Sequence, residues 1–328
     1  MHQLTINDLG RAEMAWAGMQ PWHGLGQKVR SGASLEEWQH LAGLNWEVLR
    51  RPVRFETEPE SSASSLRKLD GHFVLMRSDT HAGLSVVSKR YRVVQPKQVL
   101  EFFRSLVKGA GFEIETAGSL SGGKTVWVLA NTGLANDIVN GDRLLAYLLL
   151  ATSYDGSMAT TATFTSTRVV CNNTLRIALS RDASSQVRIR HDEEFDPDVV
   201  KSDLGLMADE SWTRFVSRMK SLSAVQMSGV EAGAALAGVL SARQPKGSDV
   251  DVTESKGYRK ILELFGGSGR GSNLAGVRNT AWGLVNAVTQ FVDFERTAQS
   301  PEKRLIGAWF GDGARLKDEI VSELLTLV

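Results

Sequence analysis

The sequence predicts an α+β fold in which a central, mostly antiparallel β-sheet domain is followed by a helical C-terminal region. Two observations lead to this expectation. Between residues 46 and 170, short stretches rich in β-branched and aromatic residues alternate with turn residues, as in an antiparallel sheet. After residue 198, apolar residues instead recur at three- and four-residue spacing, which is typical of helices. Because strands come first and helices afterwards, a doubly wound architecture is disfavoured.

The same change of pattern divides the chain into three consecutive segments. Residues 1–43 are expected to form an N-terminal arm with a short helix, which begins after the N-cap Ser34 and ends before Gly43. Residues 44–190 are expected to form a basic β-rich domain, and residues 191–328 a helical region.

The β-rich domain contains one predicted helix and a series of predicted strands. The helix runs from Pro96 to about Lys108, because proline favours the first helical position and Gly109 follows the last. Residues 56–70 are rich in serine and predict a mobile loop. The strands are expected near 48–55, 73–77, 84–94, 112–117, 126–130, 143–152 and 158–170. The last of these is rich in threonine, which favours a half-exposed sheet face.

The C-terminal region predicts helices with two flexible interruptions. One interruption covers residues 243–251, and the other is the glycine-rich stretch 266–272. The helices are expected at 198–220, 223–241, 254–265, 276–297 and 313–328.

Residues 118–125 match the phosphate-binding pattern G-x-x-x-x-G-K-[ST] at every required position. In a genuine phosphate-binding loop, a strand enters the loop and a helix leaves it, so that the helix N-terminus points at the phosphate. Here residues 126–130 read Val-Trp-Val-Leu-Ala, which favours a strand. The motif therefore predicts the turn of a β-hairpin, with a nucleotide-dependent enzyme as the less favoured alternative.

The charge distribution suggests that the protein binds a polyanion. The net charge is only +1, but residues 44–190 contain 19 Lys and Arg residues against 13 Asp and Glu residues, while both flanks are slightly acidic. A basic central region is expected where a protein binds a polyanion, although ordinary variation in surface charge could also produce it.

The remaining composition limits the possible function classes. Hydrophobic residues make up 42% of the chain, as in ordinary globular proteins. The apolar run at 144–151 is too short to cross a bilayer, and the N-terminus does not resemble a secretion signal, so we expect a cytoplasmic protein without membrane contact. The single Cys171 excludes a disulfide framework. No histidine spacing predicts a metal site, so we expect no catalytic residue, metal or cofactor.

Basic residues interleaved with aromatic ones predict a surface for single-stranded nucleic acid. Phosphates would be bound by cations, and bases would stack on rings such as Tyr91 and Trp127. Because neighbouring residues on a strand point to opposite faces, sequence alone does not place these cations on one face. The predicted nucleic-acid-binding residues are Arg50, Arg51, Arg54, Lys89, Arg90, Arg92, Lys97, Lys124, Arg168 and Arg176.

Several blocks of sequence resemble the phage/plasmid-like protein family, a domain of unknown function found on phages, prophages and plasmids. The blocks include PWHGLG at 21–26, YRVVQP at 91–96, STRVVCNNTL at 166–175 and TAWGLVNAVT at 280–289. The resemblance covers nearly the whole chain and implies a mobile-element context. In that context, a sheet followed by helices is also loosely similar to phage single-strand annealing proteins.

These observations favour a non-enzymatic homo-oligomer that binds single-stranded DNA and promotes annealing or recombination. Two alternatives remain open at this stage. One is a nucleotide-dependent enzyme that uses Lys124 and Thr125, and the other is a protein-interaction or host-defence modulator without enzymatic activity.

Overall fold

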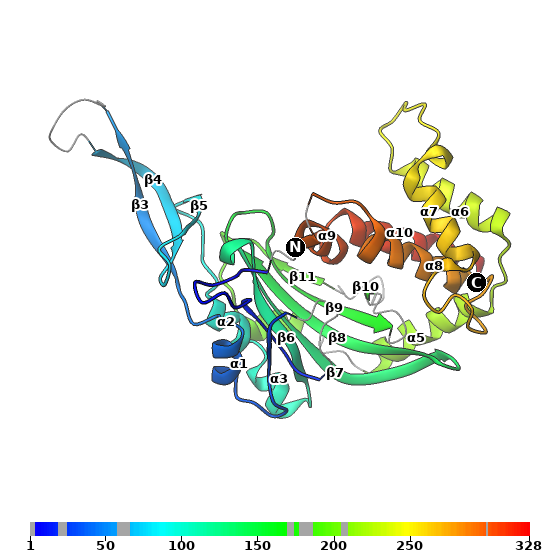
Figure 1. Cartoon of the computed structure of the whole chain (residues 1–328), viewed down its shortest axis with the longest axis horizontal. Coiled ribbons are helices and arrows are strands. Elements are labelled where there is room, and N and C mark those ends of the chain that lie inside the picture. The colour runs from blue at the N-terminus through cyan, green and yellow to red at the C-terminus, as the bar shows by residue number, and fades with distance from the viewer. Residues whose placement is uncertain are drawn as a thin grey trace. The chain divides into compact units, whose positions relative to one another are not determined.

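The computed structural model describes residues 4–18, 25–57, 66–168, 174–176, 186–204, 209–299 and 301–328. It confirms the predicted α+β class, with two mostly antiparallel sheets and a helical C-terminal part (Figure 1). None of the helices within these ranges has the length and apolar character that a membrane-spanning helix needs.

The larger sheet has the strand order β10-β9-β8-β7-β6-β1-β2, and β11 also pairs with β9. The pairing of β1 with β2 is parallel, whereas β1–β6, β6–β7, β9–β10 and β9–β11 are antiparallel. Its strands are β1 (Met14–Trp16), β2 (Gln27–Lys28), β6 (Glu113–Leu120), β7 (Thr125–Val139), β8 (Asp142–Ser153), β9 (Thr160–Arg168), β10 (Thr174–Arg176) and β11 (Gln186–Ile189).

The threonine-rich strand β9 is more buried than its composition predicts. Thr160, Thr161 and Thr163 are each at most 1% exposed, where a half-exposed face was expected. Their hydroxyls can be buried because they find partners: Thr152 and Thr160 hydroxyls lie 2.8 Å apart, and Thr161 donates to the Ala159 carbonyl.

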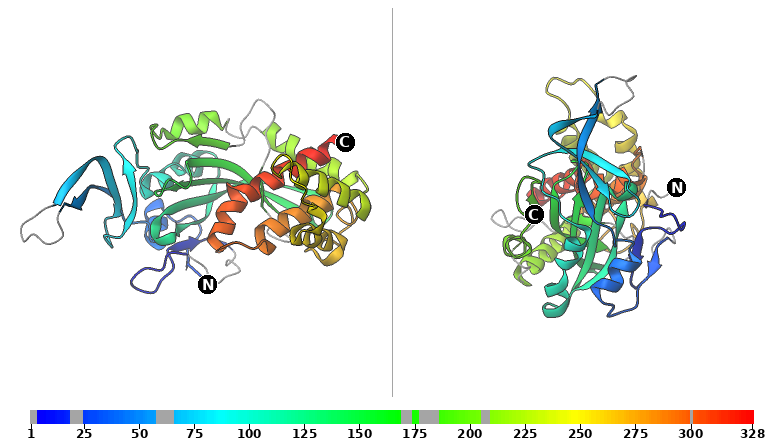
Figure 2. Two further views of the ribbon diagram at one scale, coloured as in Figure 1. Left: turned by 90° about the horizontal axis from the view of Figure 1, so that it is seen from above. Right: turned by 90° about the vertical axis from the view of Figure 1, so that its left-hand side faces the viewer.

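The smaller sheet has the order β3-β4-β5 and is antiparallel throughout. It consists of β3 (Val48–Glu56), β4 (Leu66–Arg77) and β5 (Gly83–Ser88). Residues 66–70, which were predicted to belong to a loop over 56–70, belong to β4, and residues 58–65 lie outside the described residues. Strands β3 and β4 form the long ribbon seen in Figure 1 and in both views of Figure 2.

The chain forms two compact units, neither of which is continuous in sequence. The first comprises Met1–Thr132, Leu148–Thr163 and Gln186–Asp203, and the second comprises Gly133–Tyr147, Phe164–Ser185 and Leu204–Val328. The division into three consecutive segments stays a prediction.

Short helices surround the core of the first unit: α1 (Leu35–Leu41), α2 (Pro96–Glu101), α3 (Arg104–Gly109) and α4 (Pro197–Asp203). Ser34 caps α1 as predicted, accepting a hydrogen bond from the Glu37 amide. The single helix expected at 96–108 is instead broken between α2 and α3. Phe102 and Phe103, which lie between the two helices, are both fully buried.

The second unit is mainly helical, and its longer helices are α5 (Asp209–Ala224), α6 (Gly229–Ala242), α7 (Lys256–Glu263), α8 (Ala281–Gln290), α9 (Pro301–Trp309) and α10 (Asp312–Leu324). Helix α8 is buried along its whole length, and its Trp282 donates a 2.7 Å hydrogen bond to Asp142. Both α7 and α8 continue into π-helical turns, Leu264–Ser268 and Phe291–Glu295.

Two details of the second unit differ from the expectations. Helix α9 lies in a stretch where no helix was predicted. The glycine-rich stretch 266–272, predicted to be a flexible linker, folds into an ordered loop. Its Arg270 amide donates to the Gln290 side chain at 2.8 Å, and the Arg270 guanidinium lies 4.9 Å from the Phe294 ring centre.

Candidate functional site

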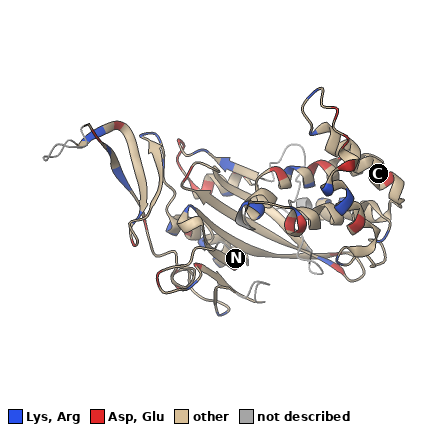
Figure 3. Cartoon of the chain, turned by 45° about the horizontal axis from the view of Figure 1, so that its top comes forward, with Lys and Arg blue, Asp and Glu red and all other residues tan. Residues whose placement is uncertain are grey.

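The predicted basic residues gather in part on the small sheet. We call strands β3, β4 and β5, with the turn after β5 through Arg90, the basic ribbon. Residues 48–90 contain eight Lys and Arg residues against five Asp and Glu residues, and Figure 3 shows the charges along these strands. Of the ten predicted site residues, the ribbon carries Arg50, Arg51, Arg54, Lys89 and Arg90.

The half of the ribbon near Arg77 has a small core of its own. Leu75 on β4 is fully buried, and Leu84 and Val87 on β5 are nearly so. On this half the Arg50 guanidinium crosses the sheet: it lies 4.4 Å from the Phe73 ring centre on β4 and donates to the Lys89 carbonyl at 3.3 Å. Arg50 and the turn that carries Lys89 are therefore in direct contact, although 39 residues separate them.

The other half of the ribbon is exposed on both faces. The register shifts between Pro52 and Arg54, and beyond the shift Arg54 pairs with Lys68 and Phe55 with Arg67. Directly opposite residues share a face, and successive residues alternate between faces. Arg54 and Lys68 therefore lie on one face, whereas Phe55 and Arg67 lie on the other.

The pair of Arg54 and Lys68 is electrostatically unfavourable. Two cations directly opposite each other in an antiparallel ladder destabilise the sheet. Lys68 has one exposed acidic neighbour, Asp70, at 4.0 Å, and no ion pair of Arg54 exists within the described residues. A bound anion between these two cations would remove the repulsion.

Large apolar side chains are also exposed on the ribbon. Phe55 is 46% exposed, Leu66 50%, Leu69 40% and Val86 59%. Leu69 follows Arg67 by two residues, so it shares a face with Arg67 and Phe55. This face combines a ring, a cation and an aliphatic side chain.

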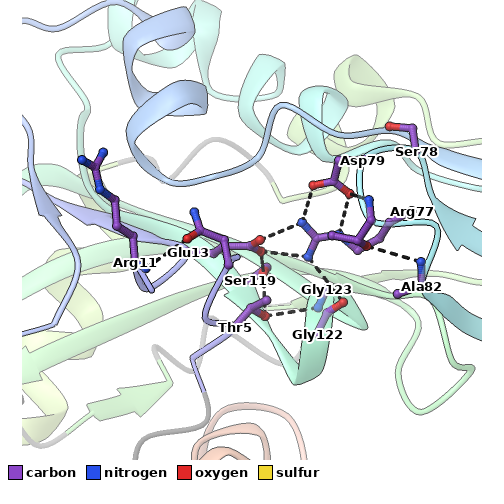
Figure 4. A network of polar contacts seen from close by, with 12 residues as sticks. Thr5, Arg11, Glu13, Arg77, Ser78, Asp79, Ala82, Ser119, Gly122 and Gly123 are labelled. Atoms are coloured by element: carbon purple, nitrogen blue, oxygen red, sulfur yellow. Dashed lines mark hydrogen bonds and ion pairs between the residues drawn. The ribbon is translucent and has the colours of Figure 1, made fainter. Parts of the chain in front are cut away.

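The buried ion pair of Arg77 and Glu13, joined by the partly exposed Asp79, holds the base of the ribbon (Figure 4). The Arg77 side chain ends β4 and is 3% exposed; its Nη2 atom lies 2.7 Å from Glu13 Oε1 and 2.7 Å from Asp79 Oδ2. Its Nη1 donates to Glu13 at 3.0 Å, and its Nε donates to Asp79 at 2.9 Å. The guanidinium also stacks on Trp46, with 4.3 Å to the ring centre. Glu13 directly precedes β1, so this cluster fixes β4 to the larger sheet.

The pKa values of Arg77 and Asp79 are both shifted in the direction that favours their charged forms. Burial raises the pKa of Asp79, but the hydrogen bonds from the Arg77 guanidinium outweigh this and hold the pKa below its ordinary value. Burial lowers the pKa of Arg77, and the hydrogen bonds to Asp79 and Glu13 outweigh that as well, so the pKa is raised.

The phosphate-loop motif lies beside this cluster and has a structural role. As predicted, the glycine turn connects two antiparallel strands, which pair from Glu113–Asn131 to Leu120–Thr125, and β7 rather than a helix follows the turn. A Cβ at Gly118 would lie 2.5 Å from the Glu13 carbonyl oxygen, and one at Gly123 would lie 3.0 Å from Arg77 and from Trp46. The motif's glycines therefore make room for close packing.

The other predicted site residues lie on different elements. Lys97 is in the first turn of α2, and Lys124 is in the turn between β6 and β7. Arg92 follows the ribbon and lies 4.0 Å from Glu194. Arg168 ends β9 and Arg176 ends β10, and both side chains lie outside the described residues.

The sequence analysis missed two ribbon cations, Arg67 and Lys68, because residues 56–70 were interpreted as a loop. The signal that could have found them is the run Leu-Arg-Lys-Leu at 66–69, in which charged and apolar residues sit together on a strand next to predicted strand 73–77. Among the described residues, no group of three or more His, Cys, Asp or Glu side chains is placed to hold a metal ion. Cys171 lies outside the described residues.

Comparison with known proteins gives one match. The family model described as a domain of unknown function, DUF932, matches residues 83–309. No curated protein and no solved structure matches the chain.

Proposed function

Because the chain belongs to the DUF932 family, for which no function is described, we propose a function from its own surface: it binds single-stranded nucleic acid through the basic ribbon. The observation that carries the proposal is the pairing of Arg54 with Lys68, directly opposite each other on an exposed face. A phosphate backbone that binds between the two cations removes their repulsion, and this makes binding more favourable.

The second face supports a single strand as the ligand. Sequence-tolerant binding of single strands combines cations, which contact phosphates, with aromatic rings, on which exposed bases stack. Phe55 and Arg67 offer this combination on neighbouring strands. Unpaired bases can reach Phe55, whereas in a duplex they are stacked on one another.

The wider role is part of the same proposal. The resemblance to phage and plasmid proteins supports DNA as the ligand, and annealing or recombination on a mobile element as the process. Because annealing requires two strands to be held at once, we also propose a homo-oligomer. A ribbon with cations on both faces agrees with this role.

The test is a binding titration of a fluorescent 30-nucleotide single strand at several salt concentrations. The double variant Arg51→Glu, Arg54→Glu reverses two exposed charges on β3. The matched control Lys246→Glu, Lys256→Glu makes the same charge change at two exposed lysines of the helical unit. We expect the ribbon variant to bind at least tenfold more weakly and the control to bind like the unmodified protein.

The salt dependence adds a second readout. Each phosphate contact to a single strand contributes about −0.7 to the slope of log K against log salt, so losing two contacts should flatten the slope by about 1.4. Phe55→Ala should weaken binding by about five- to 150-fold with the slope unchanged, since stacking on one base contributes about 1–3 kcal/mol. Equal losses in the ribbon and control variants, or no salt-dependent binding at low ionic strength, would refute the proposal.

A second candidate is a protein-interaction module. The exposed apolar side chains Phe55, Leu66, Leu69 and Val86 favour it, because clustered apolar surface is typical of protein interfaces. The same variants separate the two functions: a protein partner would lose affinity in Phe55→Ala and would show little dependence on salt.

A further inference from the structure

The second unit contains a pocket of about 390 Å³ that the proposed function does not use. Its walls come from four elements: α6, α7, the π-helical turn after α8, and α10. Tyr258 and Phe291 contribute rings, Leu240 and Ile261 contribute aliphatic surface, and Arg243 and Arg296 contribute charge. The volume lies within the range of small-molecule sites.

The π-helical turn builds one side of this pocket. The Arg296 amide donates to the Phe291 carbonyl at 2.7 Å, a five-residue hydrogen bond that closes the turn. Such turns are rare in proteins and frequently occur at functional sites. Here the turn places both of its end residues, Phe291 and Arg296, on the pocket wall.

Facing Phe291, the second residue of helix α7 is Gly257, which has no side chain. A Cβ at Gly257 would lie 3.2 Å from Phe291 Cζ. The Phe291 ring therefore packs directly against the backbone of α7, and any larger residue at position 257 would displace the ring. At this point the wall of the pocket is formed by the contact between the Phe291 ring and Gly257.

The charged side of the pocket is lined by two guanidinium groups and one carboxylate, those of Arg243, Arg296 and Asp312. Three guanidinium groups converge on Asp312: those of Arg243, of Arg296 at 2.8 Å and of Arg315 at 3.3 Å. Arg243 also pairs with Glu319. Arg315 lies outside the pocket, so the pocket itself receives the guanidinium groups of Arg243 and Arg296.

The carboxylate at the centre of this cluster stays ionised. Burial raises the pKa of Asp312, but the hydrogen bond from Arg296 and the charge of Arg243 outweigh burial and lower the pKa. Arg296 is 39% exposed, and the only side-chain contact described for it is one N–H bond to Asp312. A guanidinium carries five N–H donors, so Arg296 can bind a further anion while it keeps Asp312.

We propose that this pocket binds a small anion attached to a flat aromatic ring. The guanidinium fork of Arg296 suits a phosphate or carboxylate group, and the rings of Tyr258 and Phe291 suit a planar body of the size of a mononucleotide. The site lies wholly within the helical unit and is independent of the basic ribbon.

The test is calorimetric titration of the full chain with two sets of probes. One set is the four nucleoside 5′-monophosphates, and the other is the aromatic carboxylates phenylacetate and indole-3-acetate. We expect saturable binding to at least one set, and which set binds distinguishes a phosphate from a carboxylate ligand. Inorganic phosphate, acetate and the corresponding nucleosides should bind more weakly, because each lacks the ring or the anion. Absence of saturable binding to both sets would overturn the proposal.

Three variants then locate the site. Arg296→Gln should weaken binding by about ten- to a hundredfold, the usual effect of losing a hydrogen bond to a charged group. Phe291→Leu should also weaken binding, because it removes the ring and keeps an apolar wall. Arg315→Gln is the matched control: it loses the same kind of bond to Asp312, but Arg315 is 67% exposed and lies outside the pocket, so binding should persist.

Two further measurements separate a loss of binding at this pocket from unfolding of the variant and from effects of the basic ribbon. Each variant's melting temperature shows whether it is folded at the temperature of the titration. The ribbon variant Arg51→Glu, Arg54→Glu should bind the small anions normally. Equal weakening by Arg296→Gln and Arg315→Gln would contradict the assigned site.

Discussion

At the scale of single residues, the proposed nucleic-acid binding and the stability of the fold make opposite demands on Arg54 and Lys68. They face each other across the β3–β4 ladder, where a pair of opposite charge would be favourable. Reversing the charge of Arg54 should raise the free energy of unfolding and lower the affinity for a single strand. Both effects are expected because Arg54 faces Lys68 in the ladder and is also a proposed phosphate contact.

We therefore predict that Arg54→Glu separates the two properties. The new pair with Lys68 should leave the free energy of unfolding unchanged or raise it by up to about 1 kcal/mol. Binding to a single strand should fall, because one phosphate contact becomes a repulsion. Urea denaturation and the binding titration measure the two effects on one sample. A variant that loses stability and affinity together would indicate that Arg54 has a structural role instead.

At the scale of elements, the β6–β7 hairpin explains why the chain carries a phosphate-loop motif without its helix. Gly118 lies where β1 and β7 approach β6 closely, and a Cβ there would also lie 2.6 Å from Trp127 Cη2. Gly122 has open space around it but a φ of 69°, which favours glycine for backbone reasons alone. Gly118 thus meets a packing requirement, whereas Gly122, which occupies a free position of the motif, meets a backbone requirement of the turn.

This account predicts a ranking of three substitutions in the hairpin. Gly118→Ala should lower the free energy of unfolding by about 1–3 kcal/mol, because the methyl group forces β1 or Trp127 to move. Gly122→Ala should cost about 1–2 kcal/mol through its left-handed backbone. Lys124→Ala should have little effect on stability. Chemical denaturation of the three variants checks the order, and a large loss in Lys124→Ala with none in Gly118→Ala would reverse our interpretation.

At the scale of the whole molecule, both units contain a carboxylate whose pKa is lowered by arginine. Asp79 in the first unit pairs with Arg77, and Asp312 in the second pairs with Arg243 and Arg296. In each case the ordinary pKa is 3.8 and the folded state has a lower one. Such a group stabilises the fold above its ordinary pKa, and this stabilisation disappears as the pH falls through the lower, folded value.

We therefore predict that the protein loses stability in acid. The urea midpoint should fall between pH 7 and pH 3, and Asp79→Asn should be less stable at pH 7 but lose less on acidification. Asp249→Asn is the control, because Asp249 is exposed and no ion pair is described for it. A midpoint that stays constant, or an Asp79→Asn variant with unchanged acid sensitivity, would contradict this assignment.

Much of the local structure could be predicted, and the candidate site only in part. The strand at 48–55 and the cap at Ser34 follow from patterns within a few residues. The break between α2 and α3 was not predicted, because Phe102 and Phe103 fit the helical spacing of the apolar residues on both sides of it. The arginines on β3 were predicted as site residues. Arg67 and Lys68 were not, because they follow a serine-rich stretch and their segment was predicted to be a loop rather than the start of β4.

The sequence by itself determined the α+β class, the hairpin at the glycine motif and the basic character of the middle of the chain. These depend on periods of two or about four residues and on composition, which act locally. Only the tertiary structure decided that Arg54 lies opposite Lys68, that Arg77 meets Glu13, and that Arg243 and Arg296 converge on Asp312. Such pairs depend on strand register and on contacts between distant segments, which the packing of the core sets and no local pattern encodes.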